Sequence, residues 1–180
     1  MKHANYTFLV SIFLAFLFGM LSVSFYPRLK KKIEISGYTK EKCQKKFQEW
    51  NYGDLFLEKS GESLESFMKN NERFVIFFWA TWCSFCKPQL EVAKTLTECG
   101  IPVIGCPYEK DAEYFDFFIE KKNIEWDNLV QYKDNSKKFI IRKDEFQATL
   151  IPSWWVIENG KVKELFVGTK GSNEIIEYFK

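Results

Sequence analysis

Residues 74–87 read Phe-Val-Ile-Phe-Phe-Trp-Ala-Thr-Trp-Cys-Ser-Phe-Cys-Lys, and this stretch decides the fold. Its first six residues are aromatic or β-branched without a break, which is typical of a strand buried on both faces of a sheet. Two cysteines, Cys83 and Cys86, follow this strand directly and open a predicted helix. The pattern predicts an α/β sandwich with a cysteine pair at the end of its central strand.

The spacing of the two cysteines suits redox chemistry. Cysteines three residues apart at a helix start can close a disulfide ring, and the positive end of the helix stabilises a thiolate at the first of them. Because the thiolate is the attacking species, we expect Cys83 to be the nucleophile and Cys86, one turn into the helix, to be the resolving thiol. The alternatives are half of a zinc site or a purely structural disulfide.

The composition argues against several other functions. The 180 residues carry 26 Lys and Arg against 24 Asp and Glu, and a net charge of +2 is too small to indicate a nucleic-acid partner. No glycine-rich phosphate loop is present, and the single histidine, His3, leaves no second Cys/His pair with zinc spacing. We therefore predict no nucleic acid, no metal and no cofactor.

Strands and helices alternate along the rest of the chain. Ser63 is expected to cap a helical turn, and Asn159-Gly160 suits the tight turn of a hairpin. Strands are expected at residues 53–58, 102–106, 126–132, 154–157 and 163–167, and helices at residues 38–50, 111–121, 137–146 and 175–179.

The helix after the cysteine pair is expected to face the core with Phe85, Val92, Leu96 and Cys99. Pro88 should remove a hydrogen bond to the Ser84 carbonyl and bend this helix. On this interpretation Cys99 is a core residue. The roles of Cys43 and Cys106 stay open, and Cys106 could take part in redox chemistry because it ends a strand at the active-site edge.

Residues 6–26 form an apolar run without charge, about as long as the ~20 residues that span a bilayer as a helix. The run is either a retained membrane anchor, which we favour, or a cleaved secretory signal. Arg28 and residues 30–32, all lysine, follow it, and taken alone they favour a cytoplasmic domain. We divide the chain into an anchor and tether (1–32), an accessory segment (33–52) and a main domain (53–180).

Two stretches resemble the thioredoxin superfamily. Residues 78–87, Phe-Trp-Ala-Thr-Trp-Cys-Ser-Phe-Cys-Lys, resemble its active-site stretch, and residues 151–162 resemble its cis-proline loop and terminal hairpin. The segment between Cys106 and Thr149 is similar to the extra αβ insertion of the TlpA-type branch. Members of that branch are commonly membrane-anchored and act outside the cytoplasm.

The resemblance implies a thioredoxin-like three-layer α/β/α sandwich with a central mixed sheet, an αβ insertion and an N-terminal transmembrane helix. It implies a thiol–disulfide oxidoreductase in which Cys83 and Cys86 are catalytic. Pro152 would follow a cis peptide bond, the backbone of Ile151 would bind an extended substrate, and Trp82 would contribute to substrate binding.

The chain departs from this family at two positions. Thioredoxins carry a buried aspartate six residues before the first cysteine, where this chain has Phe77. TlpA-type reductases often carry a glutamate three residues after the second cysteine, where this chain has Gln89. Both acids are thought to assist proton transfer at the resolving thiol, so we expect slow reduction of substrates.

The favoured function is disulfide exchange with cysteines of exported proteins, supported by a membrane-bound or soluble redox partner. The domain would then lie outside the cytoplasm, tethered to the cell membrane, or be secreted if the N-terminal segment is cleaved. The alternatives are a non-catalytic thioredoxin-like binding module at the membrane and a tethered disulfide reductase that faces the cytoplasm. The sequence leaves the direction of electron flow, the substrate and the oligomeric state open.

Overall fold

The computed structural model describes residues 38–109, 111–133, 137–140 and 150–180, which all belong to one compact unit from Ile35 to Lys180. The predicted anchor at residues 6–26 lies outside the described residues. Within the described part of the chain, none of the helices combines the length and the apolar character that crossing a membrane requires.

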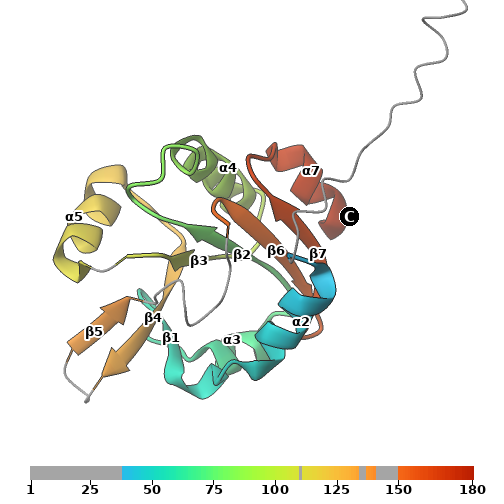
Figure 1. Cartoon of the computed structure of the whole chain (residues 1–180), viewed down its shortest axis with the longest axis horizontal. Coiled ribbons are helices and arrows are strands. Elements are labelled where there is room, and N and C mark those ends of the chain that lie inside the picture. Colours follow the sequence, from blue (N-terminus) through green and yellow to red (C-terminus); the bar gives the residue numbers. More distant parts are fainter. Residues whose placement is uncertain (1–37, 110, 134–136, 141–149) are drawn as a thin grey trace, which may run out of the picture. The chain divides into compact units, whose positions relative to one another are not determined.

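A mixed sheet forms the centre of the fold (Figure 1). Its strands are ordered β1-β4-β3-β2-β6-β7, and β5 pairs with β4. The pairs β2–β3 and β3–β4 are parallel, whereas the other pairs are antiparallel. The strands are β1 (Leu55–Leu57), β2 (Arg73–Trp79), β3 (Val103–Pro107), β4 (Asp127–Lys133), β5 (Lys137–Ile140), β6 (Ser153–Glu158) and β7 (Lys161–Val167).

Helices cover both faces of the sheet, so the α/β/α sandwich expected from the sequence is confirmed (Figure 1). Consecutive residues of a strand point to opposite faces, and Trp154 and Trp155 of β6 are both buried. The helices are α2 (Lys40–Glu49), α3 (Leu64–Asn70), α4 (Lys87–Glu98), α5 (Ala112–Lys122) and α7 (Ser172–Ile176), with 3₁₀ turns η1 (Tyr52–Asp54) and η2 (Glu177–Phe179).

Aromatic contacts show which helix covers which face. Trp79 of β2 packs against Phe115 and Phe118 of α5, and Trp154 lies on that face against α4. Trp155 packs against Phe47 of α2 on the other face. Continuous burial of β2 therefore follows from a sheet that is covered on both sides.

The accessory helix α2 contributes core residues. Cys43, Phe47 and Trp50 are buried, and the Trp50 ring stacks on the Trp155 ring at 5.8 Å between centroids. At the edge of the sheet, the Gln44 side chain accepts a hydrogen bond from the backbone N–H of Val162 in β7. The segment before residue 53 therefore contributes to the same core as the main domain.

Local signals in the sequence account for several element ends. Ser63 caps α3 by accepting a hydrogen bond from the Ser66 N–H at 3.2 Å, as predicted. Asn159 and Gly160 have φ angles of 51° and 70°, which the predicted primed turn requires. The predicted helix at residues 137–146 is wrong for its first part, because Lys137–Ile140 pairs with β4 as strand β5. Residues 141–149 lie outside the described part.

Candidate active site

The cysteine pair lies in the turn between β2 and α4. The backbone N–H of Cys83 donates to the Ala80 carbonyl at 3.2 Å, and that of Cys86 donates to the Cys83 carbonyl at 3.1 Å. These turns bring the two Cα atoms to 5.2 Å, and the sulfur atoms form a disulfide. Because β2 is buried from Phe74 to Trp79, the pair follows directly from the packed core of the sheet.

Helix α4 begins later than the sequence indicated. Cys86 is its N-cap and Lys87 its first residue, so Cys83 lies in the turn before the helix rather than at its start. Pro88 falls in the first turn, where backbone N–H groups have no partner within the helix, and Ser84 precedes the helix altogether. The predicted bend at Pro88 is therefore wrong.

The two sulfur-bearing residues differ in exposure. Cys83 is 7% exposed and Cys86 is 1% exposed, so Cys83 is the more accessible of the two. Trp82 and Phe85 flank the pair and are 68% and 69% exposed. Phe85 is thus a surface residue beside the disulfide, whereas the sequence pattern had placed it in the core.

The proline loop lies at the same edge of the sheet. The Ile151–Pro152 peptide bond is cis, as the resemblance implied, and Pro152 is buried. Ser153, the next residue, pairs with Phe78 of β2, which lies five residues before Cys83. The proline loop before β6 and the cysteine turn after β2 therefore lie at the same end of two paired strands. The substrate-binding roles of Trp82, Ile151 and Pro152 stay predictions.

A hydrogen-bonded cluster beside the loop was not found from the sequence. The Tyr38 hydroxyl accepts from the Trp155 indole N–H at 3.1 Å and lies 3.2 Å from the Ser153 hydroxyl. Burial raises the pKa of the nearby Cys43 thiol to about 11, so Cys43 is protonated at neutral pH. The only signal available was the cap residue Thr39, which predicts the helix but not its contacts.

Cys106 and Cys99 differ in burial. Cys106 is buried at the end of β3 and pairs in register with Phe78. Cys99 is exposed because α4 ends at Glu98, and the buried face of the helix is formed by Gln89, Ala93 and Leu96, of which only Leu96 belongs to the predicted stripe. The prediction that Cys99 is a core residue is therefore wrong.

Gln89 occupies the place where the resemblance leads one to expect a glutamate, and its amide makes three hydrogen bonds. Its Oε1 atom accepts from the Trp154 indole N–H at 3.1 Å and from the Lys170 N–H at 2.8 Å. Its Nε2 atom donates to the Lys170 carbonyl at 3.1 Å. Gln89 thus joins α4 to β6 and to the segment before α7, while Phe77 stacks on Trp154 at 3.9 Å.

We expect Gln89→Glu to destabilise the protein by about 1–3 kcal/mol above neutral pH, because an ionised carboxylate would face the Lys170 carbonyl without a proton to donate. A protonated glutamic acid can reproduce all three hydrogen bonds. Folding would therefore raise the carboxyl pKa, so the variant's stability is retained at low pH and lost as the pH rises. Urea unfolding at pH 5 and pH 8 measures this, and an equal difference from the parent at both values would contradict it.

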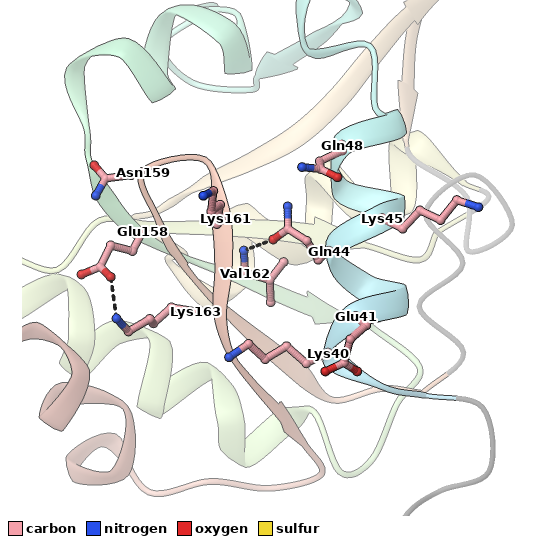
Figure 2. A pocket seen from close by; sticks show the side chains of 10 residues that line it. All are labelled: Lys40, Glu41, Gln44, Lys45, Gln48, Glu158, Asn159, Lys161, Val162 and Lys163. Carbon is pink, nitrogen blue, oxygen red and sulfur yellow. Dashed lines mark hydrogen bonds and ion pairs between the residues drawn. The ribbon is translucent and has the colours of Figure 1, made fainter.

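A separate groove of about 680 Å³ lies between α2 and the β6–β7 hairpin (Figure 2). Lysines and amides line it, and Glu158 forms an ion pair with Lys163 at 2.8 Å on its wall. None of the predicted site residues lines this groove. Among the described residues, no group of three or more His, Cys, Asp or Glu side chains is placed to hold a metal ion.

The sheet order, the covering helices, the disulfide at the end of β2 and the cis-proline loop beside it define a thioredoxin fold that carries a Cys-X-X-Cys pair. Solved structures share this fold. StoA from Bacillus subtilis is 17% identical over 71% of this chain and 98% of its own, with a TM-score of 0.54.

Two further structures are similar. A thio-disulfide isomerase from Thermus thermophilus is 22% identical over 69% of this chain and 87% of its own, with a TM-score of 0.54. The thioredoxin domain of a thiol-disulfide oxidoreductase from Bacteroides vulgatus is 17% identical over 72% of this chain and 95% of its own, with a TM-score of 0.51. No family model and no curated protein matches the sequence. These likenesses show the thioredoxin fold.

Proposed function

We propose that this chain is a thiol–disulfide oxidoreductase that exchanges disulfides with cysteines of exported proteins through Cys83 and Cys86. The observation that supports this most is the disulfide that joins Cys83, in the turn before α4, to Cys86, the N-cap of α4. The exposed side chains of Trp82 and Phe85 flank it. The N-terminal end of a helix favours negative charge, which suits a thiolate.

In the reducing direction the Cys83 thiolate attacks a substrate disulfide, forms a mixed disulfide and releases one substrate thiolate. Cys86 then attacks the Cys83 sulfur, releases the second substrate thiolate and closes the Cys83–Cys86 disulfide. Two electrons pass to the substrate, and the reverse sequence oxidises a substrate dithiol. Trp82, Ile151 and Pro152 would hold the substrate chain as an extended segment beside the sulfur atoms.

The experiment that tests the function is disulfide exchange with a model peptide that carries two cysteines. The full chain should change the peptide's redox state catalytically, and Cys83→Ser should abolish this activity because the buried Cys86 cannot replace Cys83 as the attacking thiol. Cys99→Ser is the matched control, since Cys99 is an exposed thiol outside the site and its loss should leave the rate unchanged. A parent protein without activity in either direction would instead support the non-catalytic binding module.

We further propose that the domain lies outside the cytoplasm and is tethered to the cell membrane by residues 6–26. The apolar character of that run and the similarity to the TlpA-type branch support this location, whereas the flanking lysines favour the opposite one. A reporter that is active only outside the cytoplasm, fused after Lys180, should give signal. Activity of the matched cytoplasmic reporter alone would show that the charge-based orientation holds.

A further inference from the structure

Glu109 is the only buried acidic side chain among the described residues, with 5% of its surface exposed. It lies two residues after β3, at the edge of the sheet from which the cysteine turn also emerges. Its carboxylate accepts a hydrogen bond from the backbone N–H of Thr81. Burial of a carboxylate is costly unless hydrogen bonds compensate it, so this contact ties Glu109 to the turn that carries Cys83.

Two more hydrogen bonds hold the ends of β2 and β3 together. The backbone N–H of Tyr108 donates to the Trp79 carbonyl at 2.8 Å, and the indole N–H of Trp82 donates to the Tyr108 carbonyl at 3.2 Å. Trp79 is in register with Pro107. With three bonds between the two segments, the Glu109 carboxylate has a fixed position relative to the cysteine turn.

That position is close enough for an electrostatic effect on Cys83. The Cys83 N–H donates to the Ala80 carbonyl and so closes a four-residue turn, whose ends lie within about 7 Å. The carboxylate bonded to Thr81 in the middle of this turn therefore lies within about 10 Å of Cys83. At that separation two unit charges near a protein surface change an equilibrium by about tenfold.

We propose that Glu109 sets the redox poise of the Cys83–Cys86 pair, because its negative charge disfavours the Cys83 thiolate and so favours the disulfide. This inference rests on the proposed function. Glu109 is then a buried acid close to the cysteine pair, whereas positions 77 and 89 carry no acid. That acid lies in the connection between β3 and α5 instead of in β2 or α4.

Equilibration with glutathione measures the redox poise of the cysteine pair. The protein disulfide and two glutathione thiols give the protein dithiol and one glutathione disulfide, so two electrons pass to the cysteine pair. Each protein sulfur ends as a thiol, or as a thiolate with its proton released to the solvent. Removal of the Glu109 charge should favour the thiolate and hence the reduced protein.

The test equilibrates the full chain in glutathione mixtures at pH 7, in a Cys99→Ser background. Glu109→Gln keeps an oxygen that can accept from the Thr81 N–H and removes only the charge. Glu158→Gln is the matched control because it makes the same change of net charge at the opposite end of β2, where Glu158 pairs with Arg73. Because Arg73 and Trp79 are six residues apart in β2, Glu158 lies about 20 Å from Trp79.

We expect Glu109→Gln to raise the ratio of reduced to oxidised protein three- to tenfold, and Glu158→Gln to match the parent. A Glu109→Gln ratio equal to that of Glu158→Gln, or a shift toward the disulfide, would overturn the inference. Should Glu109→Gln not fold, Glu109→Asp and Glu109→Asn give the same comparison at equal size, with a higher reduced fraction expected for Asn.

The peptide-exchange assay separates the two proposals. If the parent exchanges disulfides with the peptide but Glu109→Gln leaves the ratio of reduced to oxidised protein unchanged, only the role of Glu109 is overturned. A parent that equilibrates with glutathione but exchanges with no peptide overturns the proposed function, and the ratio still reports on Glu109.

Discussion

Gly105→Ala is expected to lower the free energy of unfolding by about 2–4 kcal/mol, the upper range for overpacking a closed core. A Cβ atom at this position would lie 2.0 Å from Oδ1 of Asn128 and 2.9 Å from Nε1 of Trp79. Both neighbours are fully buried, and Asn128 pairs in register with Gly105 across β3 and β4. Neither side chain can move aside without disturbing the sheet.

Urea unfolding measures the loss as a decrease of the midpoint at an unchanged slope. Gly53→Ala is the matched control, because a Cβ there would meet nothing closer than 3.7 Å. The control should stay within about 0.5 kcal/mol of the parent. Equal midpoints for the two variants would show that β3 and β4 can separate enough to admit a methyl group.

Cys86→Ser is expected to reduce disulfide-exchange turnover by at least about a thousandfold and to accumulate a mixed disulfide at Cys83. Resolution by Cys86 is intramolecular, and the effective concentration of a group held in place exceeds that of any external thiol by several orders of magnitude. Without Cys86, the substrate stays attached to Cys83. Mass spectrometry under non-reducing conditions detects the adduct at one substrate per chain.

The background for this experiment is Cys99→Ser, because an exposed thiol would form adducts of its own. The reciprocal variant, Cys83→Ser, should form little adduct, since Cys86 is 1% exposed. Preferential trapping by Cys83→Ser would reverse the assignment of nucleophile and resolving thiol. In the Cys86→Ser variant the rate of Cys83 alkylation against pH should also report a pKa below the free value of ~8.5.

The parts of the fold that the sequence predicted have local causes. An unbroken apolar run makes β2, Ser63 caps α3, and Asn159-Gly160 makes the hairpin turn. The cis bond before Pro152 was expected only because residues 151–162 resemble the thioredoxin superfamily, whereas the cysteine pair is visible as a short motif. Each of these signals depends on neighbours in the chain, so no knowledge of distant contacts is needed to find them.

The parts that were wrong or missed depend on contacts between distant residues. Residues 137–140 are a strand because the edge of β4 offers partners, which a weak helical pattern cannot reveal. Tyr38 reaches Ser153 across 115 positions, and Glu109 reaches Thr81 across 28. Polar side chains that meet only in the folded chain leave no periodic pattern, so this part of the site could not be read from the sequence.

The contact between Gln44 and β7 bears on self-association. β7 is an edge strand, and open N–H groups on such an edge can recruit a strand from another molecule. The Gln44 side chain occupies the N–H of Val162, and α2 lies along the hairpin beside it (Figure 2). Helix α2 thus covers part of the β7 edge, and we expect this cover to hinder edge-to-edge pairing between copies of the domain.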